Sequence, residues 1–382
     1  MEAHAQESDP ARTLAVLPMR RQVVLGALAC SAFAPSLMAC SSSATDEQAA
    51  ARALRRAGNV DAGNRSMLMR ELVRCATLAP SSHNTQCWRF HVQERSITIA
   101  PDLSRRCPVV DPDDHHVYVS LGCATENLAQ AALAHGLRAD ARVDPGGLGA
   151  IEVGLEPTQA SPSPLFQAIA ERQCTRGDYD GQPLSTDELR RLEQAGTGDG
   201  VRVLLLTQRA ALEQVLEYVV AANTVQMNDP AFIAELKTWI RFGADEATRT
   251  GDGLFAGASG NPALPRWLGS RMMDLFFTPK SENERYARQL RNSAGVAVFS
   301  SDAGDRRHWV EVGRCYERFA LQATTLGIRN AFLNQPVEVG AIRPQFASAL
   351  GLGERRVDLI VRFGRGPAMP LSMRRPVQDV LA

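Results

Sequence analysis

The chain has 382 residues, and its 42 lysines and arginines balance 42 aspartates and glutamates, so the formal net charge is zero. This balance argues against a general nucleic-acid-binding protein, which would carry a basic surplus. With 45% hydrophobic and 22% charged residues, the composition is that of a globular protein and excludes disordered, collagen-like and polytopic membrane classes.

The first forty residues have the layout of an export signal. An arginine pair at positions 20 and 21 precedes a short apolar core, and small residues lead to the sequence LMAC, which ends at Cys40. The arginine pair resembles a twin-arginine signal, and LMAC resembles a lipobox with Cys40 as the lipidated residue. We therefore expect residues 1–40 to be a signal peptide and the protein to be periplasmic or anchored to a membrane through Cys40. A general secretory signal with an incidental Cys40 is the alternative, and without a used signal the protein stays cytoplasmic.

The elements expected after a linker over residues 41–65 indicate an α+β fold. A stripe of apolar residues from Leu68 to Ala79 has helical spacing and stops at Pro80. Alternation of apolar and polar residues predicts half-buried strands, and two short apolar runs predict further strands. The alternating segments are 88–92, 97–99 and 357–363, and the apolar runs are 201–206 and 296–299. A segment rich in glycine, alanine and proline, within residues 252–273, is expected to form an excursion or lid.

One internal repeat indicates two related halves. The segment GCATENLAQAALAHGLR (122–138) aligns without gaps on GRCYERFALQATTLGIR (313–329), at a constant offset of 191 residues. Both segments read as helices with small residues on one face, which allows two helices to approach closely. We expect a first half over residues 66–160 and a second half over 161–382, packed like the subunits of a dimer. Two unrelated alanine-rich helices are the alternative.

Cysteine spacing and one acidic loop give no metal or dithiol signature. The six cysteines beyond Cys40 contain no Cys-x-x-Cys pair, so buried free thiols are favoured over disulfides or a zinc site. The loop DPDDHH, from Asp111 to His116, contains metal-capable side chains, but its spacing favours a polar loop. We therefore assign no metal-binding residue.

The most informative stretch is APSSHNTQCWRF, residues 79–90, which joins the first predicted helix to the first strand. Its hydroxyl and amide side chains could hydrogen-bond the edge of a heteroaromatic ring. On these residues alone, a polar turn is an equal alternative.

This stretch resembles the signature Ala-Pro-Ser-Ser-x-Asn-x-Gln-Pro-Trp-x-Phe of the nitroreductase-like flavoproteins, with Cys87 in place of the proline. Three further motifs are similar to those of the family. They are an Arg-x-Ser-x-Arg phosphate motif with cysteine for serine, a Pro-x-Glu turn and a basic C-terminal phosphate contact. The residues that the resemblance assigns to cofactor binding are Pro80, Ser81, Ser82, Asn84, Arg172, Cys174, Arg176, Pro336, Glu338, Arg374 and Arg375.

The motif order resembles the Acg-type branch, in which two nitroreductase halves are fused. The resemblance implies a nitroreductase-like α+β fold, a monomer with an internal pseudo-dimer, and one complete site for flavin mononucleotide (FMN) shared by both halves. It further implies that arginines bind the FMN phosphate, that Asn84 and the two serines contact the ring and ribityl chain, and that the Glu338 backbone N–H faces flavin N5.

The implied function is hydride or electron transfer through FMN to an unknown acceptor, with no side chain required as acid, base or nucleophile. A non-catalytic protein that binds or sequesters flavin is the alternative. Export would separate the protein from nicotinamide cofactors, which are cytoplasmic, so an exported enzyme would need a quinol or a protein as electron donor.

Overall fold

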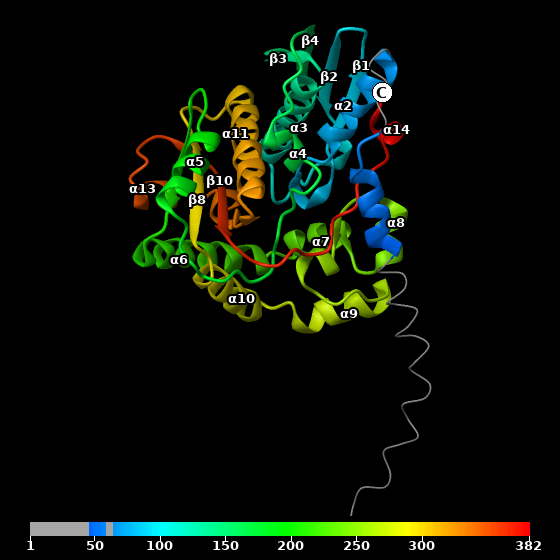
Figure 1. Ribbon diagram of the computed structural model, residues 1–382. Coiled ribbons are helices and arrows are strands. Elements are labelled where there is room, and N and C mark those ends of the chain that lie inside the picture. The colour runs from blue at the N-terminus through cyan, green and yellow to red at the C-terminus, as the bar shows by residue number, and fades with distance from the viewer. Residues whose placement is uncertain (1–45, 59–63) are drawn as a thin grey trace, which may run out of the picture.

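The computed structural model describes residues 46–58 and 64–382. Within them the chain forms two four-stranded antiparallel sheets, which lie on either side of a central helix pair (Figure 1). The predicted signal peptide and Cys40 lie outside the described residues. Among the described helices, none is both long and apolar enough to cross a membrane.

The first half is one sheet covered by two helices. Its strands lie in the order β1-β2-β4-β3, so the last strand of the half is inserted between β2 and β3. The elements are α2 (Arg65–Thr77), η1 (Ser82–Asn84), β1 (Trp88–Val92), β2 (Ser96–Pro101), η2 (Leu103–Arg105), α3 (His115–Ala134), β3 (Leu137–Val143) and β4 (Ile151–Pro157). Asn64 caps α2, and the helix ends three residues before Pro80, as its apolar stripe predicted.

The second half repeats this arrangement. Its sheet has the order β5-β8-β10-β9, and α11 connects β8 to β9 as α3 connects β2 to β3. The repeated elements are β5 (Val201–Leu206), β8 (Gly295–Ser301), α11 (Arg306–Thr325), β9 (Arg329–Phe332) and β10 (Arg356–Gly364). Because strand order and helix position both recur, the α+β fold with two related halves is confirmed.

The two halves meet where α3 crosses α11 at a pair of glycines. A Cβ added to Gly122 would lie 2.0 Å from the carbonyl oxygen of Val310, and one added to Gly313 would lie 2.0 Å from that of Val119. The two contacts are related by the same offset of 191 residues as the sequence repeat. The helices therefore cross with their backbones in contact, which explains why the repeat retains glycine at this position.

Strand β10 was predicted to be half-buried, but it is buried on both faces. Residues on both of its faces are buried, including Asp358 and Arg362, whose polarity had suggested a solvent-facing side. The reason is that helices cover both faces of this sheet, with α11 on one side and the helices α12 and α13 on the other. Its polar residues therefore lie in the interior, where they need partners.

Most of the second half's extra length lies between β5 and β8. This insertion contains α6 (Arg209–Met227), α7 (Pro230–Trp239), β6 (Ile240–Arg241), α8 (Ala244–Thr250), β7 (Leu254–Phe255), η3 (Gly257–Ser259), α9 (Arg266–Phe276) and α10 (Pro279–Arg291). The predicted excursion over residues 252–273 is the part from β7 into α9. Smaller helices complete the fold: α4 (Pro164–Ala168), α5 (Thr186–Gly196), α12 (Gln335–Glu338), α13 (Arg343–Ala349) and α14 (Val377–Val380).

Two segments depart from the predicted domain boundaries. The expected linker contains a helix over residues 46–55, in which Ala51 packs against α8. The C-terminal segment leaves β10 and crosses to the first half, where Leu381 forms a β-bridge with Phe90 (Figure 1). We call residues 370–382 the C-terminal strap. The strap follows the second half in the sequence, but it packs against the first half.

Candidate functional site

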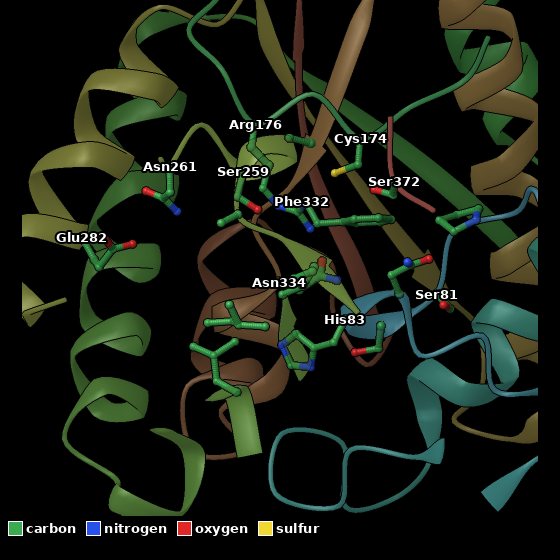
Figure 2. A pocket seen from close by; sticks show the side chains of 18 of the residues that line it. Ser81, His83, Cys174, Arg176, Ser259, Asn261, Glu282, Phe332, Asn334 and Ser372 are labelled. Carbon is green, nitrogen blue, oxygen red and sulfur yellow. The ribbon is translucent and has the colours of Figure 1, made fainter. Parts of the chain in front are cut away.

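A cavity of about 510 Å³ opens between the two halves, beneath the insertion. Its wall combines the 80–84 segment of the first half, the 172–176 segment, α6, α9 and the C-terminal strap. Figure 2 shows Ser81 and His83 on one side, Cys174 and Arg176 opposite them, and Ser259 and Asn261 of the insertion beside Arg176. Segments distant in the sequence therefore share one concave site of the size usual for small-molecule ligands.

Most of the residues assigned by resemblance lie on this wall. The lining residues among them are Pro80, Ser81, Ser82, Asn84, Arg172, Cys174, Arg176, Glu338 and Arg374. Pro336 is buried at the start of α12 and does not line the cavity. Arg375 also points elsewhere, because its guanidinium donates to the backbone oxygen of Asp379. The assignment of Arg375 as a phosphate contact therefore stays a prediction, without support from the cavity lining.

Three arginines form a buried positive cluster at one end of the cavity. Arg55, Arg172 and Arg374 are 6%, 2% and 6% exposed. Burial, followed by repulsion from Arg172, lowers the pKa of Arg55 to about 10. Burial and repulsion from the other two arginines hold the pKa of Arg374 well below its usual value. Like charges buried together are unfavourable, so this end of the cavity favours an anion.

Arg374 is held by carbonyl groups at the end of α2. Its guanidinium donates to the backbone oxygens of Thr77, Leu78 and Ala79, to that of Met373, and to the side-chain oxygen of Asn84. A helix C-terminus carries partial negative charge, so this position suits a cation. All five of its N–H groups are occupied, and Arg374 can act on a ligand through its charge alone.

Arg172 pairs with Glu317 inside the protein. Its Nε lies 3.0 Å from Oε1 of Glu317, at an angle that forms an ion pair without a hydrogen bond, and Nη2 donates to Leu78. Burial raises the pKa of Glu317 to about 7, although Arg172 acts in the opposite direction. Near neutral pH this carboxyl group is therefore only a partial counter-charge to the three arginines. Nη1 of Arg172 has no hydrogen-bond partner within residues 46–58 and 64–382.

Arg176 and Arg55 differ in how they reach the cavity. Arg176 is half-buried on the wall, and its guanidinium contacts no acceptor in the described part of the chain. Arg55 instead donates to the backbone oxygens of Ala170, Arg172 and Ser372. Sequence analysis missed Arg55 because it lies in the expected linker, outside any recognised motif.

The Ser-Ser-x-Asn loop has an unusual backbone. His83, Asn84 and Gln86 have φ values of 48°, 54° and 53°, in the left-handed region that non-glycine residues rarely adopt. Such strain concentrates at functional sites. The ring of His83 lies among the cavity residues in Figure 2, and burial lowers its pKa to about 4, with Arg176 adding to the effect. His83 therefore faces a ligand as a neutral imidazole.

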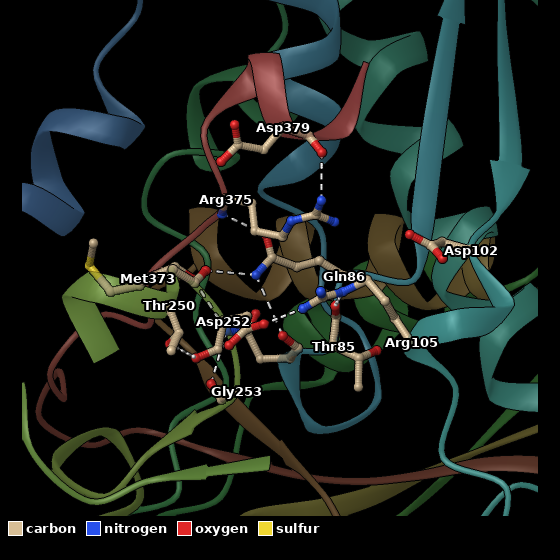
Figure 3. A network of polar contacts seen from close by, with 12 residues as sticks. Thr85, Gln86, Asp102, Arg105, Thr250, Asp252, Gly253, Met373, Arg375 and Asp379 are labelled. Atoms are coloured by element: carbon tan, nitrogen blue, oxygen red, sulfur yellow. Dashed lines mark hydrogen bonds and ion pairs between the residues drawn. The ribbon is translucent and has the colours of Figure 1, made fainter. Parts of the chain in front are cut away.

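The hydrogen bonds of Asn84 differ from the role that the resemblance implies, and Gln86, to which the resemblance assigned no role, bonds in the same way. The Asn84 amide donates to Gly253 and to Met373, and its oxygen accepts from Arg374. Gln86 likewise donates to Gly251 and accepts from the backbone of Arg375 (Figure 3). These amides join the insertion and the C-terminal strap to the first half, so the direct contact expected between Asn84 and a ring is replaced by a positioning role.

The predicted excursion over residues 252–273 is anchored where it begins. Asp252 forms ion pairs with Arg105 and with Arg241, whose Nη2 lies 2.7 Å from Oδ1 of the aspartate (Figure 3). Beyond this anchor the segment turns over the cavity, where Leu254, Leu264 and Met273 contribute apolar wall. The segment expected to be a lid thus covers the cavity; movement of the lid stays a prediction.

Glu338 contributes a carboxyl group to the wall but not a free backbone donor. Its N–H donates to the carbonyl of Asn334 at 2.9 Å, because Glu338 ends the short helix α12. The implied contact between this N–H and flavin N5 is therefore not supported. The side chain accepts from Gln226 and lies 3.6 Å from Nε2 of His116. Burial raises its pKa to about 7, so the group can hold a proton near neutral pH.

The predicted polar loop at residues 111–116 leads into a buried cluster. Asp111, His115 and His116 have ligand atoms within 4.8 Å of one another. Asp111 accepts the backbone N–H groups of His116 and Val117 and so caps α3, while His115 bonds to Asp358. Burial raises the pKa of Asp111 to about 7 and lowers that of both histidines. Through these contacts within the protein, the three side chains hold the buried start of α3 in place.

Free thiols were predicted correctly for the described cysteines. Cys75, Cys87, Cys107, Cys123 and Cys315 are buried and unpaired, and Cys174 is half-buried on the cavity wall. Cys107 lies 3.3 Å from Nδ1 of His83 and supports the strained loop. The sequence gave no signal for this contact, because the two residues are 24 positions apart.

Comparison with known proteins identifies relatives of similar length. Two proteins of Mycobacterium tuberculosis H37Rv, named "Putative NAD(P)H nitroreductase Rv3131" and "Putative NAD(P)H nitroreductase acg", are 25% and 22% identical to the chain over 330 residues. Each alignment covers 82% of this chain, with 90% of the first relative and 95% of the second. The chain is similar to nitroreductases. No protein-family model matches it.

Solved structures give weaker likenesses to nitroreductases. An FMN-bound nitroreductase from Desulfitobacterium hafniense DCB-2 has a TM-score of 0.37 and 17% identity, over 58% of this chain and 98% of its own. The nitroreductase NfnB from Mycobacterium smegmatis, in complex with NADPH, has a TM-score of 0.35 and 13% identity, over 53% and 87% of the two chains.

Proposed function

We propose that the protein is an FMN-dependent oxidoreductase of the nitroreductase type, with its flavin in the cavity between the two halves. The observation that carries the proposal is the buried cluster of Arg55, Arg172 and Arg374 at one end of that cavity. Glu317 is the sole carboxylate paired with any of the three within the described residues, and its raised pKa weakens that compensation. A phosphate monoester carries nearly two negative charges and would offset the remaining excess.

The available donors suit a phosphate. Arg172 and Arg176 line the cavity, and neither Nη1 of Arg172 nor the guanidinium of Arg176 has an acceptor in the described chain, so both could bond phosphate oxygens. Arg374 would add charge, because all of its N–H groups already have acceptors in the protein. Arg55 would also add charge, and its two terminal nitrogens already donate to backbone carbonyls. Arginine suits this task because its planar fork matches phosphate oxygens.

The rest of the cavity suits a flavin ring and a second substrate. Ser81 and Ser82 belong to the same segment as Asn84, which bonds to Arg374, and apolar side chains from α7 and α9 also line the cavity. When bound, FMN would supply hydride or electron transfer. The protein would orient the ring, exclude water beneath the insertion and hold a proton on Glu338 near neutral pH.

The electron donor depends on where the protein acts. The names of the two relatives include NAD(P)H. If residues 1–40 serve as an export signal, we propose that a quinol or a protein takes the place of that donor. Anaerobic mixing with NADPH checks this step, since a nicotinamide-dependent enzyme would lose its flavin absorbance and a quinol-dependent one would keep it.

Flavin content tests the main proposal. Purified protein should show flavin absorbance, and Arg176→Ala should release flavin more readily, since the residue has no structural contact to lose. Arg172→Ala should have a larger effect, and Arg314→Ala is the matched control, because Arg314 lies on α11 and pairs with Glu126 away from the cavity. Colourless wild-type protein after reconstitution with FMN would refute the proposal. Reduced protein that no acceptor reoxidises faster than air would leave a flavin-binding protein and refute the oxidoreductase.

A further inference from the structure

Helix α9 presents large apolar side chains to water. Trp267, Met272, Leu275 and Phe276 are 68%, 40%, 69% and 63% exposed. They cover the outward half of the helix together with two exposed charged residues, Arg271 and Asp274, and the Asp274 carboxylate pairs with Lys237. A surface helix of a globular protein normally turns its polar face outward, so this orientation calls for a partner.

The orientation of α9 is fixed by its inner face. Gly269 lies so close to Phe242 that an added Cβ would be 2.5 Å from the ring, and Met273 packs into the same cluster. Arg266, at the start of the helix, forms an ion pair of 2.6 Å with Glu246 of α8. The outward apolar face therefore follows from packing, because turning the helix would break these contacts.

The exposed face continues into the cavity. Met272 and Phe276 line the cavity and are also exposed at the molecular surface. Trp267 and Leu275 extend this apolar rim away from the opening. Figure 1 places α9 at the opposite end of the molecule from the sheet β1–β4. Whatever covers this face therefore also lies at the entrance to the cavity.

The start of the described chain lies on the same side. The helix over residues 46–55 packs against α8, which α9 contacts through the Arg266–Glu246 pair. Cys40, the predicted lipidation site, precedes this helix by six residues, which span at most about 20 Å. A lipid on Cys40 would therefore enter a membrane close to α9. A second copy of the chain or a protein partner would cover the apolar face without accounting for this proximity.

We propose that α9 docks on a lipid bilayer through Trp267, Met272, Leu275 and Phe276. A helix with Trp, Phe and Leu on one face inserts that face at the boundary of headgroups and acyl chains, with arginine reaching the headgroups. The entrance to the cavity then faces the membrane. This docking does not depend on bound flavin, so it can fail or succeed separately from the proposed function.

Vesicle binding tests the proposal in the full chain with Cys40→Ser, which removes lipidation as a cause of binding. The protein should co-sediment with phosphatidylcholine–phosphatidylglycerol vesicles. Trp267→Ser and Leu275→Ser should each weaken partitioning by about tenfold, the effect of withdrawing one large apolar side chain from lipid. Leu148→Ser is the matched control, because Leu148 is an exposed leucine in the turn between β3 and β4. Flavin absorbance of each variant verifies that the cavity is intact.

Three results would overturn the proposal. The Cys40→Ser chain could remain in the supernatant, or the α9 variants could bind vesicles as well as the Leu148 control. Alternatively, sedimentation equilibrium without vesicles could show a dimer that Leu275→Ser abolishes, which would assign the face to a second copy of the chain.

Discussion

The contact between α3 and α11 gives a sharp prediction for Gly313→Ala. The new methyl group would lie 2.0 Å from the carbonyl oxygen of Val119 and 3.0 Å from the backbone nitrogen of Cys123. Backbone atoms cannot move aside as a side chain can, so the helices must separate by about 1 Å to reach the closest contact that proteins tolerate. Overpacking of this kind costs about 3 kcal/mol, and the better helix propensity of alanine returns about 1 kcal/mol. We expect a net loss of about 2 kcal/mol.

Denaturant unfolding, followed by circular dichroism, measures this loss. Gly340→Ala is the control, because a Cβ at Gly340 meets no described atom within 4 Å and its φ is not positive. The Gly313 variant should also bind flavin less tightly, since Glu317 lies one helical turn further along α11 and pairs with Arg172. If Gly313→Ala unfolds at the same denaturant concentration as Gly340→Ala, the account of the helix crossing is wrong.

Two further predictions concern the cavity wall. The pKa of Glu338 is raised from 4.5 to about 7, so its contribution to stability is present below pH 4.5 and lost as the pH rises to about 7. Glu338→Gln should therefore gain stability relative to wild type across this interval, and a constant difference in melting temperature would contradict the shift. Arg374→Lys replaces five donors with at most three, so amide hydrogen exchange in residues 373–382 should accelerate at least about tenfold. Unchanged exchange there would show that Arg374 does not hold the C-terminal strap.

Local patterns located several of the elements that form the two sheets and the central helix pair. Helical spacing from Leu68 located α2, and alternation located β1 and β2, because these features depend on which face of an element is buried. The same rule misjudged β10, whose Asp358 and Arg362 are buried. Alternation reports polarity and cannot report whether a second layer of helices covers the polar face.

Most of the residues that the motifs assigned do line the cavity, but the motifs did not show what each one does there. Asn84 and Arg374 carry the right chemistry for a ligand, yet their hydrogen bonds join the strap to the first half. Arg55 belongs to no motif and reaches the cavity only through the packing of its helix on α8. Hydrogen-bond partners distant in the sequence compete with a ligand for the same donors, and only the fold determines which of them is within reach.

The balanced charge and the repeat at an offset of 191 residues are properties of the sequence alone; the charge argued against a nucleic-acid-binding protein, and the repeat indicated two related halves. The tertiary structure decided where charge gathers: a neutral chain places three arginines in the interior, at the cavity shared by both halves. Net charge is a sum over residues, whereas the field at a site depends on distance and burial. Those quantities exist only once α3 and α11 have brought the halves together.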